Sequence, residues 1–123
     1  MSPDDAPHAR AYTEPDSEDP RLRGRSYAVP FARVWRAALD EIAARRRWTL
    51  VDADPKSGEI VAEARTQVWK FTDDIWIRIS LDENGLTRVD MASTSRVGRM
   101  DFGVNARRIV RFLQALDRRL KIA

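Results

Sequence analysis

The residues best placed to do chemistry lie where the loop Gly98–Gly103 leads into a predicted helix. Two glycines permit unusual backbone angles, and the free N–H groups of a helix N-terminus attract an anion. Polar side chains on and around this loop make it a candidate site for a phosphate or carboxylate group: Arg96, Arg99, Asp101, Asn105 and Arg108. A structural interpretation competes with this one, because Asp101 itself supplies a negative charge that can pair with Arg96 or cap the helix.

Two adjacent carboxylates, Asp73 and Asp74, stand at the start of a predicted strand. Neighbouring side chains of a strand point to opposite faces, so these two do not form an acid/base pair. One of them is expected to meet Arg96 across the sheet, and Asp73 joins the candidate ligand-binding residues. A metal site shared with Asp101 is disfavoured by the surrounding arginines, so neither a metal nor a cofactor is predicted.

Composition excludes several kinds of catalysis. The chain has no cysteine, and its single histidine, His8, lies near the N-terminus outside the predicted domain. Thiol nucleophiles, zinc knuckles and histidine-based triads or metal sites are therefore absent. Ser93 and Ser95 have no general base within reach in the sequence, so no catalytic residue is assigned. The sequence favours a non-catalytic protein over an enzyme.

The periodicity of apolar residues predicts an α+β domain with the order β-α-β-β-β-β-α. A helix over Phe31–Arg47 follows Pro30 and carries an apolar stripe, with three arginines in its last turn. Period-two alternation then predicts strands, with Asp82–Gly85 as a hairpin turn and Ile75, Ile77 and Ile79 on one face. Strands are expected at 25–29, 48–52, 59–66, 74–81 and 86–93, and a closing helix at 105–120 with Asn105 as its N-cap. A curved antiparallel sheet with both helices on its isoleucine face results, similar in element order to helix-grip domains.

The first 24 residues differ in composition from the rest. They contain four prolines, six acids and few large apolar residues, which predicts a disordered acidic tail before a single domain over residues 25–123. Residues 1–20 have a net charge of −5, so the remainder of this +3 chain carries +8. An anionic membrane surface is therefore a possible partner, whereas nucleic acid is disfavoured by the lack of a binding motif; the alternative is charge spread over solvated faces.

Trp76 lies opposite the isoleucines, on the sheet face that a two-layer domain leaves open to water. Trp69 precedes it and is expected to share that surface. Exposed aromatic residues often mark a contact surface, so both are candidate interface residues for a protein partner or for oligomerisation. Partial cover by Arg78 and neighbouring long side chains is the alternative.

Three motifs together resemble a known family. They are Phe71-Thr-Asp-Asp74, Ser93-Thr-Ser-Arg-Val-Gly98, and Asp101-Phe-Gly-Val-Asn105 followed by Arg108-Ile109. This pattern is similar to that of the uncharacterised bacterial and plastid family called domain of unknown function 1499, over roughly residues 25 to 121. The resemblance implies no established activity, cofactor or catalytic residue. It implies association with the cell envelope for some relatives.

Two functional hypotheses follow. The leading one is a non-catalytic binding or assembly module that uses the open sheet face around Trp76 or the loop near Arg96. The second is a small anionic-ligand or enzymatic site built on the strand-to-helix segment 96–108. No signal or membrane-spanning segment is visible, which indicates the cytoplasm for the sequence as written, while the resemblance points to the envelope.

Overall fold

The computed structural model describes residues 9–66, 71–98 and 103–121. The elements are β1 (Arg10–Tyr12), the short 3-10 helix η2 (Pro20–Leu22), β2 (Arg25–Tyr27), α1 (Phe31–Ala44), β3 (Trp48–Asp54), β4 (Glu59–Arg65), β5 (Thr72–Leu81), β6 (Thr87–Ser95) and α2 (Val104–Arg119). The predicted α+β class and the order β-α-β-β-β-β-α are confirmed, with the additional strand β1 at the front.

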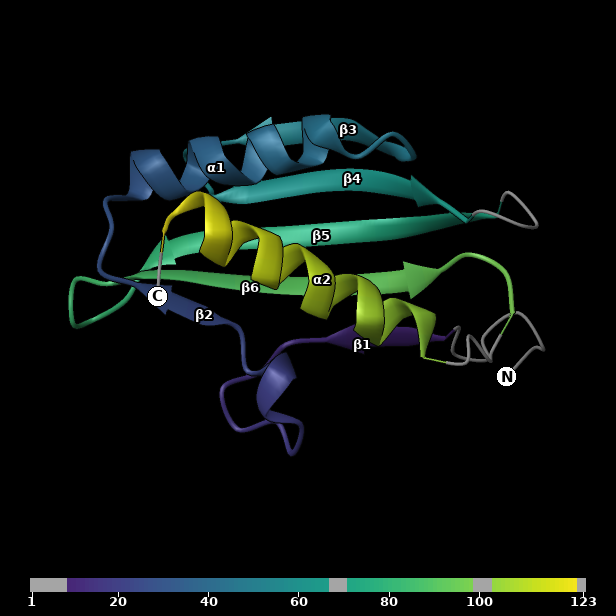
Figure 1. Cartoon of the computed structure of the whole chain (residues 1–123), viewed down its shortest axis with the longest axis horizontal. Coiled ribbons are helices and arrows are strands. Elements are labelled where there is room, and N and C mark those ends of the chain that lie inside the picture. The colour runs from purple at the N-terminus through teal and green to yellow at the C-terminus, as the bar shows by residue number, and fades with distance from the viewer. Residues whose placement is uncertain (1–8, 67–70, 99–102, 122–123) are drawn as a thin grey trace.

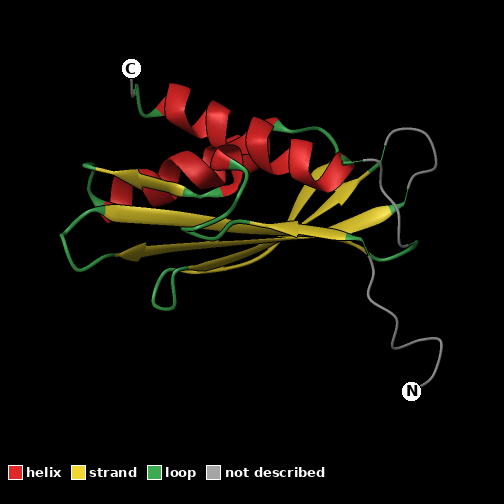
Figure 2. Ribbon diagram, turned by 90° about the horizontal axis from the view of Figure 1, so that it is seen from below, coloured by secondary structure: helices red, strands yellow, loops and turns green. Residues whose placement is uncertain are grey.

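One antiparallel sheet organises the domain. Its strand order is β1-β6-β5-β4-β3. Strand β2 also pairs with β6, at residues 87–89, whereas β1 pairs with residues 92–94. Both helices lie across the same face of the sheet, as Figures 1 and 2 show from two directions. The other side of the sheet, called the open face below, is covered by neither α1 nor α2. Neither helix has the length and apolar composition needed to cross a membrane.

The core lies between the sheet and the helices. Alternation along β5 buries Ile75, Ile77 and Ile79, as the sequence predicts, because every second side chain points toward the helices. From α2, Phe112 is fully buried and stacks on Trp48 of β3 with ring centroids 5.3 Å apart. These contacts fix α2 against the sheet and thereby place the start of the helix over the ends of β5 and β6.

The predicted disorder of the first 24 residues is wrong for residues 9–24. Strand β1 pairs with β6, and Thr13 is buried, with its backbone N–H donating to the Met91 carbonyl at 2.8 Å and its hydroxyl donating to Asp90 at 2.8 Å. Composition failed here because the unpaired edge of β6 supplies hydrogen bonds that order a segment with few apolar residues. Residues 1–8 lie outside the described residues.

Helix α1 ends at Ala44, three residues before its predicted end. Arg45 has extended backbone angles, so the arginines 45–47 follow the helix and do not form its last turn. The Arg45 guanidinium lies 5.2 Å from the ring centroid of Trp48 and 5.4 Å from that of Phe112. Burial lowers the pKa of Arg45, and its ion pair with Glu41 at 3.1 Å acts in the opposite direction.

Candidate functional site

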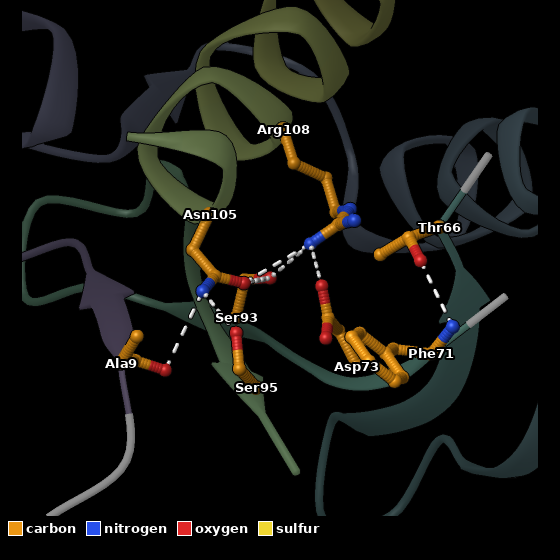
Figure 3. Close-up of polar contacts among 8 residues, drawn as sticks. All are labelled: Ala9, Thr66, Phe71, Asp73, Ser93, Ser95, Asn105 and Arg108. Atoms are coloured by element: carbon orange, nitrogen blue, oxygen red, sulfur yellow. Dashed lines mark hydrogen bonds and ion pairs between the residues drawn. The ribbon is translucent and has the colours of Figure 1, made fainter. Parts of the chain in front are cut away.

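Five polar side chains meet beneath the first turns of α2: Asp73, Ser93, Ser95, Asn105 and Arg108. This polar cluster is shown in Figure 3. Asp73 comes from β5, the two serines from β6, and Asn105 and Arg108 from one side of α2, three residues apart. Because the residues lie on the core face, the helix covers them, and Ser93 and Asn105 are fully buried.

Asn105 is the central hydrogen-bonding residue of the polar cluster. Its Oδ1 accepts from the Ser93 hydroxyl at 2.6 Å and from Arg108 Nη1 at 3.0 Å, and its Nδ2 donates to Ser95 Oγ at 2.9 Å. Nδ2 also donates to the Ala9 carbonyl at 3.4 Å, which ties the start of β1 to the helix. The side-chain amide thus joins β6, α2 and the segment before β1.

The prediction that Asn105 caps α2 is wrong. The N-cap is Gly103, whose φ of 79° is a left-handed conformation that glycine adopts without strain. Asn105 is the second residue of the helix, and its side chain is directed at the sheet. A sequence pattern cannot separate these two roles, since asparagine suits both an N-cap and a buried hydrogen-bond network.

Arg108 and Asp73 form a buried ion pair. Arg108 Nη1 lies 2.8 Å from Asp73 Oδ2, with side-chain exposures of 11% and 4%. The same nitrogen donates to Ser93 Oγ at 3.1 Å. A charge in such a place is tolerated only when it is paired and hydrogen-bonded. Arg108 and Asp73 therefore neutralise each other's charge within the cluster.

Arg96 lies on the opposite side of the sheet from the polar cluster. Its guanidinium contacts Asp74 at 2.7 Å and Glu63 at 2.8 Å, which confirms that one of the paired aspartates meets Arg96 across the sheet. The hydrogen bonds that Arg96 donates to Asp74 and Glu63 raise its pKa, because both carboxylates favour the charged form of the guanidinium. The structure thus separates Arg96 from Asp73, Asn105 and Arg108.

Three of the candidate residues, Trp69, Arg99 and Asp101, lie outside the described residues. Asp73 and Asp74 point to opposite faces and have separate arginine partners, so together they cannot hold one ion. Across residues 9–66, 71–98 and 103–121, no group of three or more acidic or histidine side chains is arranged to bind a metal.

The open face carries an apolar row that the sequence only partly indicated. The strand register aligns Tyr12 with Ala92, Ala92 with Trp76, and Trp76 with Val61. Trp76 is partly buried and Tyr12 is 47% exposed. The alternation of β4, β5 and β6 could have identified Val61 and Ala92, whereas Tyr12 required the pairing of β1.

Charged residues flank this apolar row on both sides. Toward one end of the strands, the register aligns Arg10, Thr94, Asp74 and Glu63, and Arg96 adds its ion pairs there. Toward the other end it aligns Asp90, Arg78 and Glu59. The open face therefore has an apolar centre and a charged border.

The fold and the polar cluster define a two-layer α+β domain whose buried hydrogen-bond network joins the last strand to the last helix. The chain matches the family model described as "Protein of unknown function (DUF1499)" over residues 2–116, and it belongs to that family. The match begins well before β2 and so includes β1. No curated protein matches the chain.

Proposed function

We propose that this domain is a non-catalytic docking module whose contact surface is the open face. The observation that carries the proposal is the apolar row of Tyr12, Ala92, Trp76 and Val61 across four strands. Protein interfaces combine an apolar, aromatic centre with a polar border, and tryptophan and tyrosine are enriched among the residues that contribute most binding energy. The open face has both features.

The alternative of a small anionic-ligand or enzymatic site has weaker support. Such a site needs side chains that are free to bind a ligand, whereas the described groups of the polar cluster bond to one another. Arg108 and Asn105 share Ser93, and Arg108 neutralises Asp73. Arg96 is engaged with two carboxylates on the other face. These arrangements favour a structural role for Arg96, Asn105 and Arg108.

Site-specific photocrosslinking tests the docking surface. A photoreactive side chain at Thr94, on the open face beside the apolar row, is expected to give discrete adducts in cells that make the protein. Replacing Trp76 with Ala should weaken binding by about 30-fold, since an aromatic residue at an interface centre contributes about 2 kcal/mol or more. The measurement is the yield of adducts with and without the replacement.

The control places the same photoreactive side chain at Gln114, an exposed position of α2. It should give no discrete adduct, because the helices lie on the far side of the sheet from Thr94. Unfolding of each variant is followed by circular dichroism, so that lost adducts are not confused with lost folding. Equal adducts from both positions, or adducts that survive Trp76→Ala, would contradict the proposal.

A second candidate function is binding of an anionic lipid surface by the helices, and the charge distribution favours it. Helices α1 and α2, residues 31–44 and 104–119, contain seven basic and three acidic residues, a net charge of +4, whereas residues 48–98 have a net charge of −3. Two of the three acids are engaged: Glu41 pairs with Arg45 and Arg119, and Asp117 with Arg25. Arg111 and Arg118 lie exposed on α2 at helical spacing.

Vesicle binding at several salt concentrations tests this second function. Binding to vesicles rich in anionic phospholipid should fall steeply with salt, and the double change Arg111→Glu and Arg118→Glu should weaken it by at least about 30-fold. The matched control, Arg65→Glu with Arg78→Glu, makes the same charge change on exposed strand residues and should have a smaller effect. Binding to duplex DNA without binding to vesicles would contradict this candidate.

A further inference from the structure

We infer that the partner of the open face is a second copy of this chain, bound face to face about a twofold axis. This inference rests on the proposed docking function and names its partner. In a symmetric dimer the same surface of both copies must be complementary to itself. The strand register allows that requirement to be examined residue by residue.

The axis that satisfies it runs along the strands, between β5 and β6. Rotation about this axis places β5 of one copy over β6 of the other, and β4 over β1. Strands of the two sheets then remain nearly aligned, which is the common geometry when sheets pack face to face. Register partners on neighbouring strands form rows that run across the sheet. Each open-face side chain therefore meets, on the second copy, the residue of the same row that lies equally far from the axis on its other side.

The apolar row is self-complementary under this rotation. Trp76 of β5 meets Ala92 of the second copy, because the two are register partners on adjacent strands. Tyr12 meets Val61, since each lies one strand further from the axis. A large side chain thus opposes a small one in each pair, which lets the two rows fit together without a gap or an overlap.

The charged borders are self-complementary as well. Arg78 meets Asp90 of the second copy, and Arg10 meets Glu63, so each contact joins opposite charges. Asp90 also pairs with Arg88 of its own chain and Glu63 with Arg96, so the dimer adds a second cation to each carboxylate. The symmetry produces each contact twice. Charge complementarity of this kind fixes the register of an interface and excludes other arrangements.

The face has the outline of a small specific interface. Four strand positions about 4.8 Å apart, with β6 nine residues long at about 3.3 Å each, span at most roughly 19 by 30 Å, because β4 has seven residues and β1 three. The relief of the side chains increases the accessible area above this flat outline. The flat outline of roughly 570 Å² lies below the roughly 800 Å² per partner of a standard interface and is in the range of weaker ones.

Charge reversal at Arg10 and Glu63 tests the dimer, with the full chain studied by sedimentation equilibrium over a wide range of concentrations. Arg10→Glu and Glu63→Arg should each weaken self-association by at least about tenfold, because each creates two like-charge contacts in the dimer. A mixture of the two variants should restore association. In the mixed dimer the two introduced side chains face each other with opposite charges. The unchanged Glu63 of one chain and the unchanged Arg10 of the other form the native contact.

The control is Arg36→Glu, which makes the same charge change on α1 and should leave association unchanged. Two results would overturn the dimer: a monomeric wild-type chain at every concentration, or an association that ignores the charge reversals and is not restored by mixing. If the chain is monomeric while Thr94 still crosslinks to another protein, the docking function stands and only the identity of the partner is wrong. If Thr94 gives no adduct, the docking function fails too.

Discussion

Replacing Arg108 with Ala is expected to destabilise the domain by about 3–5 kcal/mol, because it leaves the carboxylate of Asp73 buried without a cation. Asp73 is 3% exposed, and Arg108 Nη1 is its partner at 2.8 Å. Ser93 and Asn105 lose a hydrogen-bond donor in the same change. Urea unfolding followed by circular dichroism measures the loss.

Two further variants make this result specific to the buried pair. Adding Asp73→Asn to Arg108→Ala should recover part of the stability, since the uncompensated charge is removed. Arg96→Ala removes an arginine whose partners are exposed, so it should cost much less. A loss for Arg108→Ala no larger than that for Arg96→Ala would contradict the structural role of the polar cluster.

The same measurement distinguishes a structural role of the polar cluster from its use as a ligand site. If the polar cluster is structural, Arg108→Ala lowers the free energy of unfolding whether or not any small molecule is present. If it is a ligand site, the arginine is needed for binding, and its removal costs little stability in the free protein. The burial of Ser93 and Asn105 favours the first outcome, because a site open to ligand would leave them accessible.

The sheet was predictable from the sequence because its signal is local. Alternation in β5 identified the buried isoleucines, and the same alternation assigned Asp73 and Asp74 to opposite faces before any partner was known. The hairpin at Asp82–Gly85 places β6 beside β5, which is why one of the two aspartates was expected to meet Arg96; the structure identifies it as Asp74. Where apolar and polar residues alternate along a strand, the alternation determines which face of the sheet each side chain occupies.

The remaining features depend on contacts between distant segments. The three residues of β1 carry no strand signal of their own and are ordered by the edge of β6. Thr13, which follows β1, contacts Asp90 of β6, 77 residues away in the sequence. Asn105 and Arg108 are spaced to share a helix face, yet only the packing of α2 decides whether that face meets water or the sheet. The polar cluster and the apolar row of the open face therefore required the three-dimensional structure.

Replacing Gly58 with Ala is expected to cost about 3 kcal/mol, from two causes that act together. Gly58 has a φ of 76°, a conformation that costs an alanine about 1–2 kcal/mol. A Cβ at this position would also overlap the backbone carbonyl oxygen of Ile79, and forced overlap in a packed region costs a further 1–3 kcal/mol or so. The Gly58 carbonyl accepts from the Ile79 N–H at 2.8 Å, so relieving the overlap would separate β5 from the turn before β4.

Gly85 is the matched control, because it isolates the contribution of the backbone contact. Its φ of 79° is nearly the same, but a Cβ there would meet no atom of the described residues within 4 Å. Gly85→Ala should therefore cost only the conformational term, about 1–2 kcal/mol. Thermal and urea unfolding of both variants give the difference between them. Equal losses would mean that β5 does not approach Gly58 closely, and the register that aligns Glu59 with Arg78 at the border of the open face would then be in error.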